Sequence, residues 1–242
     1  VLNGDYEELG SELVTNGGFA VDSDWSGTGS NGYSISSGKL NLSDSAYATN
    51  VAQANVTTIG KAYKVTFEIS NYVKGSVRIF LGGNVTSSVN SNGTYTFHVV
   101  ASANTSAGVQ ALNGGGTTLS LDNLSLKQVD PNDRWSKGTG WTISDGKASN
   151  DGSTGNLTQN GILTVDDQYE ITVTVSDYVS GSVQVTAGAQ FHGSSSILSA
   201  NGTYTLIQTC SPTTSLFLVS SSFNGKIDNV TVREYAIQPQ DV

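Results

Sequence analysis

Tyr63-Lys-Val-Thr-Phe-Glu-Ile-Ser-Asn-Tyr-Val-Lys-Gly-Ser-Val-Arg-Ile79 returns later in the chain as Tyr169-Glu-Ile-Thr-Val-Thr-Val-Ser-Asp-Tyr-Val-Ser-Gly-Ser-Val-Gln-Val185. In both copies apolar residues alternate with polar ones, the period that places one face of a strand in a core and the other in water. A Ser-Asn/Asp-Tyr-Val-x-Gly turn and a second alternating run follow, so we expect a β-hairpin with a longer loop. Two copies so far apart in 242 residues predict two domains rather than a solenoid.

Composition favours an all-β fold. The chain has 28 glycines and only 13% charged residues, and alternating runs recur along it. We therefore expect two tandem antiparallel β-sandwiches of the jelly-roll type. The expected parts are a solvated N-terminal arm at 1–11, a first sandwich at 12–129, a second at 130–235 and a C-terminal tail at 236–242. The Pro-containing acidic segment Val129-Asp-Pro-Asn-Asp133 is the expected linker.

Charge and cysteine content exclude several function classes. A formal net charge of −9 repels phosphate backbones and anionic lipids, so no nucleic-acid or membrane partner is expected. No apolar run is long enough to span a membrane, and the N-terminus has no signal-peptide pattern. Cys210 is the one cysteine, so an internal disulfide is excluded, and a buried, inert thiol is expected.

Catalytic patterns are missing from the sequence. The sequence marks out no catalytic role for His98 or His192, and no pair of carboxylates is marked out for acid–base work. No nucleophile elbow or phosphate-binding loop is present. We expect a protein that is not an enzyme.

Several short patterns together resemble a known family. They are Asn16-Gly-Gly-Phe19 followed by Trp25, the Trp-x-x-Gly-Thr-Gly-Trp of 135–141, the repeated Tyr-x-Val/Ile-Thr run, and a closing strand with Asp-Asn at 122–123 and 228–229. Taken together, they resemble the carbohydrate-binding-module-like jelly rolls of tailed-phage virion proteins. The resemblance covers about residues 12 to 235 and lies in the whole pattern more than in any one motif.

This resemblance implies a non-catalytic structural or adhesion role at the virion surface. It implies a tail fibre, head fibre or capsid-decorating protein whose partners are other virion proteins and a host-surface glycan, with a homotrimer as the assembly. The alternative is a secreted carbohydrate-binding module from a glycoside hydrolase-type protein, and both readings stay open at this point.

The resemblance also raises the question of a structural calcium ion. Such domains often hold one with an acid after the Asn-Gly-x-Phe stretch and an Asp in the closing strand, a place that Asp122 and Asp228 match. Ala20 stands where the acid would be, and the second copy has no Asn-Gly-x-Phe stretch. Calcium needs six to eight oxygen ligands, so we expect no metal cofactor and a hydrogen-bonding role for both aspartates.

Aromatic residues are the remaining candidates, because such sandwiches usually stack sugar rings on exposed aromatic side chains. The expected glycan contacts are Tyr33, Trp141, Tyr72 and Tyr178. Phe80 falls on the outward phase of its strand together with Arg78, and an outward Phe predicts contact with another subunit or domain. The two copies differ mostly on this outward phase.

Overall fold

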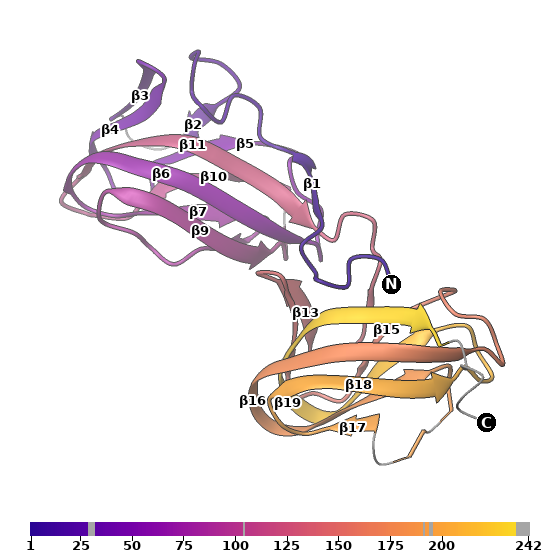
Figure 1. The fold of residues 1–242 in the computed structure, drawn as a ribbon. Coiled ribbons are helices and arrows are strands. Elements are labelled where there is room, and N and C mark those ends of the chain that lie inside the picture. The colour runs from indigo at the N-terminus through magenta and orange to yellow at the C-terminus, as the bar shows by residue number, and fades with distance from the viewer. Residues whose placement is uncertain (29–31, 104, 191, 194–195, 236–242) are drawn as a thin grey trace. The chain divides into compact units, whose positions relative to one another are not determined.

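The computed structural model describes residues 1–28, 32–103, 105–190, 192–193 and 196–235, and the expected tail at 236–242 lies outside them. The elements of the described chain are β-strands (Figure 1). No helix in these ranges has the length and apolar character needed to cross a membrane. The fold is all-β and antiparallel, as the sequence predicts.

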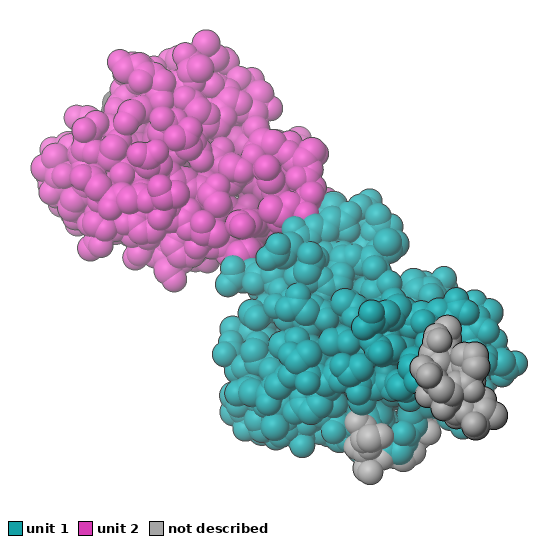
Figure 2. All heavy atoms as spheres, in the orientation of Figure 1, with its two compact units in different colours: residues 1–8, 130–242 teal, residues 9–129 magenta. Residues whose placement is uncertain are grey.

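The chain forms two compact units (Figure 2). Unit 2 is continuous and consists of residues 9–129, whereas unit 1 combines residues 1–8 with residues 130–242. The boundary after Val129 falls within the predicted linker.

Unit 2 is a sandwich of two antiparallel sheets. Its described strands are β1 (Leu9–Glu12), β2 (Ser26–Thr28), β3 (Tyr33–Ser36), β4 (Lys39–Ser45), β5 (Asn50–Gln53), β6 (Ala62–Lys74), β7 (Val77–Leu81), β8 (Asn84–Val85), β9 (Gly93–Val100), β10 (Ala107–Ala111) and β11 (Thr117–Val129). One sheet has the order β3-β4-β11-β6-β9 with β1 beside β11, and the other has the order β2-β5-β10-β7-β8.

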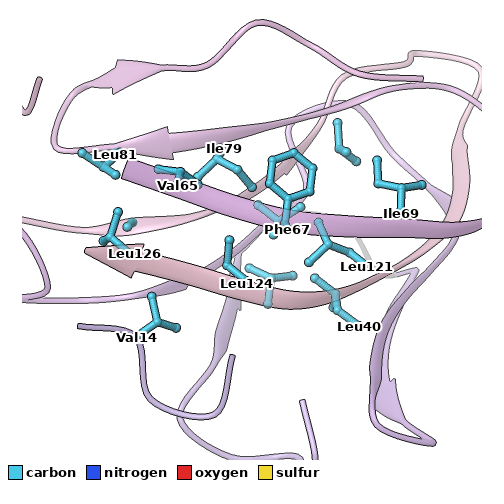
Figure 3. Packing of buried hydrophobic residues seen from close by; sticks show 14 of the residues in the cluster. Val14, Leu40, Val65, Phe67, Ile69, Ile79, Leu81, Leu121, Leu124 and Leu126 are labelled. Atoms are coloured by element: carbon cyan, nitrogen blue, oxygen red, sulfur yellow. The ribbon is translucent and has the colours of Figure 1, made fainter. Parts of the chain in front are cut away.

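The core of unit 2 is filled by the apolar phase of these strands (Figure 3). On β6, Val65, Phe67 and Ile69 are at most 1% exposed, and their polar neighbours are half-buried. Ile79 and Leu81 of β7 are buried from the opposite sheet. The alternation in the sequence therefore identifies the buried residues correctly.

The expected hairpin is wrong, because β6 and β7 lie in different sheets. β6 pairs with β11 and β9, and β7 pairs with β10 and β8. The chain turns from one sheet to the other between Asn71 and Gly75, which have φ angles of 53° and 82°. Positive φ angles bend the chain sharply away from a regular strand, so the Asn-Tyr-Val-x-Gly pattern makes a corner of the sandwich.

Unit 1 repeats this design with longer strands. Its described strands are β12 (Ser136–Lys137), β13 (Trp141–Ser144), β14 (Lys147–Asp151), β15 (Asn156–Gln159), β16 (Gln168–Ala187), β17 (Ile197–Leu198), β18 (Gly202–Thr209) and β19 (Leu216–Glu234). β16 continues through the equivalent corner without a break. Its residues 168–175, before the corner, pair with β18, and its residues 183–184, after the corner, pair with β17. It pairs with β19 along both parts.

Residues 1–11, which the sequence predicted to be a solvated arm, are instead held in the fold, so this prediction is wrong. Tyr6 is 1% exposed and packs in unit 1, with its ring centroid 5.3 Å from that of Trp135. Leu9–Glu12 pairs with β11 of unit 2. The acidic residues around Tyr6 suggested a solvated segment, but the burial of one aromatic ring and the backbone hydrogen bonds beside it hold the segment in the fold.

Candidate functional site

Trp141 does not offer a surface to a ligand. Its side chain is 5% exposed, its indole N–H donates to the carbonyl of Gly155 at 3.0 Å, and its ring stacks 6.2 Å from that of Phe223. A tryptophan held on all sides in this way stabilises the sandwich. The expectation that Trp141 contacts a glycan is therefore wrong in this structure.

Tyr72 and Tyr178 occupy the same place at the two corners. The hydroxyl of Tyr72 donates to the carbonyl of Gly75 at 3.2 Å, and that of Tyr178 to the carbonyl of Gly181 at 3.0 Å. Both rings are half-buried. This repeated bond closes the corner, so packing and turn geometry account for both tyrosines.

Tyr33, on β3, is half-buried and packs against the core of unit 2. Its ring covers Gly27, where an added Cβ would come within about 2.2 Å of three ring and hydroxyl atoms. The four expected glycan contacts thus lie two in each unit and form no single cluster.

Phe80 and Arg78 lie on the outer face of the β2-β5-β10-β7-β8 sheet, as their phase predicts. Both are half-buried. The Arg78 Nε–H donates to the side-chain oxygen of Gln110 at 2.7 Å, and the Gln110 amide donates to Asn50 at 2.9 Å. Contact with another subunit, which the sequence suggested for this pair, stays a prediction.

A hollow of about 330 Å³ lies beside Phe80. Its lining combines one aromatic ring with small and amide side chains, namely Ser26, Asn50, Ala52, Gln53, Ala54 and Ser106. The hollow combines an aromatic ring with several hydrogen-bonding groups, two features that are found together in small-ligand sites.

Unit 1 carries a matching face that the sequence reasoning missed. Phe217 of β19 is half-buried and lines a hollow of about 210 Å³. The other lining residues are Asn156, Gln184, Thr186, Ala189, Gln190 and Val219. The signal was available, since Phe217 falls between the buried Leu216 and Leu218, the same outward phase that marked Phe80.

When the two units are compared by their repeat, Phe80 and Phe217 lie on adjacent strands of the equivalent sheet, at the same cross-strand level. In unit 2, Phe80 pairs with Gly108, and in unit 1, Thr186 pairs with Phe217. Thr186 is the repeat counterpart of Phe80 by sequence and register. Each unit therefore places one ring at the same level of the same face, opposite a small partner, although the residue that supplies it differs. We call these surfaces the Phe80 face and the Phe217 face.

The aspartates of the closing strands make hydrogen bonds. Asp122 accepts from the Asn123 backbone N–H at 2.6 Å, and Asp228 accepts from the Asn229 N–H at 2.7 Å. The Lys147 ammonium lies 3.3 Å from the Asp228 carboxylate and forms an ion pair with it. In the described parts of the chain, no three Asp, Glu, His or Cys residues gather at one point. Hydrogen bonds thus account for both aspartates, and the absence of a metal cofactor stays a prediction.

Cys210 is buried, and its thiol lies 3.1 Å from the carbonyl oxygen of Thr213. Burial, followed by the charges of Asp167 and Asp166, raises the pKa of this thiol. A high pKa keeps the thiol protonated and poorly nucleophilic, which agrees with the inert cysteine that the sequence predicts.

Comparison with known proteins finds only distant likenesses. The CBM22-1-CBM22-2 tandem domain of Paenibacillus barcinonensis Xyn10C aligns over 94% of this chain and 99% of its own, with 9% identity and a TM-score of 0.38. The major capsid protein P2 of bacteriophage PM2 aligns over 88% of this chain and 98% of its own, with 11% identity and a TM-score of 0.22. No protein-family model and no curated protein matches the sequence. Likenesses with TM-scores this low support no inference about the function of this chain.

Proposed function

We propose that this chain is a non-catalytic, glycan-binding adhesion component of a bacteriophage virion, either a fibre or a capsid-decorating protein. The observation that carries the glycan-binding role is the recurrence of an outward phenylalanine beside amide side chains at the same cross-strand level of both units. The partners would be a host-surface glycan and other virion proteins, with a homotrimer as the assembly, at the virion surface and without a metal cofactor.

The chemistry of the two faces suits a sugar. One side of a pyranose ring presents C–H groups that pack on an aromatic ring, and its hydroxyls both donate and accept hydrogen bonds. A half-buried Phe offers the apolar contact, and Asn and Gln amides carry a donor and an acceptor each. Asn50 lines the hollow beside Phe80, and Asn156 and Gln184 line the hollow beside Phe217.

The same faces do not suit hydrolysis. Breaking a glycosidic bond generally requires two carboxyl groups set apart across the sugar. The described residues that line the two hollows include no Asp, Glu or His. This supports a binding role for the faces.

The virion setting rests on the sequence resemblance, and a secreted binding module would use the same faces. Mass spectrometry of purified phage particles from the source of this sequence separates the two settings. We expect the chain among the particle proteins. Its absence from particles, together with its recovery from culture fluid, would support the secreted alternative.

A glycan array tests the binding role directly. We expect the intact protein to bind a subset of bacterial surface glycans. Phe80→Ala combined with Phe217→Ala should lower the affinity of each face by about 5- to 30-fold or more, because an aromatic anchor commonly contributes at least about 1–2 kcal/mol to its own site.

Tyr47→Ala is the matched control, because this aromatic is 62% exposed and lies off both faces. It should leave binding unchanged. Binding that the double substitution does not weaken, or that falls equally with Tyr47→Ala, would refute the assignment of the two faces. A protein that binds no glycan at all would favour the subunit contact predicted for Phe80 and Arg78.

A further inference from the structure

After β1, residues 15–19 of unit 2 form a short segment that inserts an aromatic ring into the core, and we call this segment a plug. Asn16 and Phe19 have φ angles of 52° and 47°, which turn the chain so that the Phe19 ring enters the core. Phe19 is fully buried, with its ring centroid 5.0 Å from that of Trp25. The Trp25 indole N–H donates to the carbonyl of Asn16 at 3.0 Å.

Residues 2–6 make the same plug in unit 1. Asn3 and Tyr6 have φ angles of 52° and 55°. Tyr6 packs on Trp135 as Phe19 packs on Trp25, and the Trp135 indole N–H donates to the carbonyl of Asn3 at 2.9 Å. Asn3-Gly-Asp-Tyr6 is thus the Asn-Gly-x-aromatic stretch that the second copy was expected to lack.

A glutamine holds the backbone of each plug in the same way. The side chain of Gln159 accepts from the Leu2 N–H at 2.8 Å and donates to the Leu2 carbonyl at 2.7 Å. Gln53 makes the same pair of bonds to Thr15. Gln159 and Gln53 are equivalent, since each ends the fourth described strand after its plug tryptophan, β15 after Trp135 and β5 after Trp25.

The closing strand completes the match. The Val230 N–H donates to the carbonyl of Gly4 at 2.8 Å, and the Leu124 N–H donates to that of Gly17 at 2.9 Å. A Cβ on Gly4 or Gly17 would lie 2.0 or 1.9 Å from the carbonyl oxygen of the same strand residue. Only glycine allows this approach, so both plugs require the same residue for the same reason.

From these matched contacts we infer that residues 1–8 are the first element of the second repeat, and that unit 2 is inserted between this element and the rest of unit 1. The Asp130 N–H donates to the Glu8 carbonyl at 3.0 Å, and the Arg134 guanidinium lies 3.4 Å from the Glu8 carboxylate. The two ends of the interrupted repeat therefore meet where unit 2 leaves and returns.

Because unit 2 is inserted in this way, residues 1–8 at the N-terminus hold together unit 1, whose other residues begin at Asp130. Withdrawal of residues 1–8 would uncover Trp135 and leave the Gln159 amide without its partners, so unit 1 would open. Unit 2 has its own plug and is continuous, so its stability would not change.

Cys210 provides a built-in reporter, because the one thiol of the chain is buried in unit 1. We expect Tyr6→Ala in the full-length protein to raise the rate at which a thiol reagent labels Cys210 by about 100-fold or more, since removing a buried aromatic ring increases the population of open molecules by at least that factor. Phe19→Ala removes the matching ring from unit 2 and should leave the labelling rate unchanged.

Gln159→Ala and Gln53→Ala form a milder pair in case Tyr6→Ala fails to fold. Gln159→Ala should accelerate labelling about 10-fold, and Gln53→Ala should not. Equal labelling rates for Tyr6→Ala and the parent protein, or equal acceleration by the two members of either pair, would overturn the inference.

Discussion

At the scale of single residues, Tyr6 differs from its counterpart Phe19 by a hydroxyl that gains nothing in the fold. Among the described residues this hydroxyl is buried and has no hydrogen-bond partner. A buried polar group without a partner loses its hydrogen bonds to water and receives none in return. Phe19 shows that the plug works without it.

Tyr6→Phe should therefore leave unit 1 as stable as before or stabilise it by about 1–2 kcal/mol at neutral pH. Chemical denaturation followed by the exposure of Cys210 measures the change. A loss of stability would mean that the hydroxyl has a partner. Tyr169→Phe serves as the contrast in the same unit, because the Tyr169 hydroxyl accepts from the Thr164 N–H at 2.9 Å and its loss should be destabilising.

At alkaline pH the buried hydroxyl of Tyr6 should lower the stability of unit 1. Burial, followed by the charges of Asp228 and Asp130, raises the pKa of Tyr6 well above its ordinary value of 10. A group whose pKa is raised in the folded state contributes stability that is complete below the unfolded pKa and is lost as pH rises through the interval up to the folded pKa.

Between about pH 10 and the higher folded pKa, unit 1 of the parent protein should lose stability that Tyr6→Phe retains. Thermal unfolding of both proteins at pH 7, 9 and 10.5 tests this. The difference between their midpoints should widen at the highest pH in favour of Tyr6→Phe, and a constant difference would contradict the prediction.

At the scale of elements, the corner between the sheets depends on glycine. Gly75 and Gly181 have φ angles of 82° and 71°. A Cβ on Gly75 would lie 2.7 Å from the Thr117 Cα, and one on Gly181 would lie 2.0 Å from the Ser222 carbonyl oxygen. Both positions thus combine an unfavourable backbone conformation with a backbone atom in contact.

Gly75→Ala and Gly181→Ala should each destabilise by about 2–4 kcal/mol, one in unit 2 and the other in unit 1. Gly60→Ala is the control, because its φ is also 82° but its Cβ would meet nothing within 4 Å, so only the conformational cost of about 1 kcal/mol applies. Calorimetry of the three variants measures the order. Equal losses at Gly60 and Gly75 would show that close packing at the corner is unimportant.

The corner also shows where sequence reasoning succeeds and fails. Alternation located β6 and the buried side of Phe67 correctly, because periodicity reports on one strand and its two faces. It could not tell whether β7 pairs with β6 or crosses to the other sheet, because partner choice depends on distant strands such as β10. The exposure of Trp141 was wrongly predicted for a related reason, because its ring is covered by Phe223, which lies far along the chain.

At the scale of the whole molecule, two sandwiches were predictable, but their nesting was not. A search for repeats assumes that each copy is continuous, and Asn3-Gly-Asp-Tyr6 lies before the first copy while serving the second. The Phe217 face escaped for a similar reason, because its ring sits on a different strand from that of Phe80. Only the fold brings these residues to equivalent positions.

If both faces bind a glycan, each chain should have two binding sites. Isothermal titration calorimetry with a short oligosaccharide identified on the array measures the number of sites per chain. The parent protein should bind two molecules with similar affinity, Phe80→Ala and Phe217→Ala should each weaken one of the two sites, and the double variant should weaken both while remaining folded. Two sites that persist with unchanged affinity in the double variant would contradict the account.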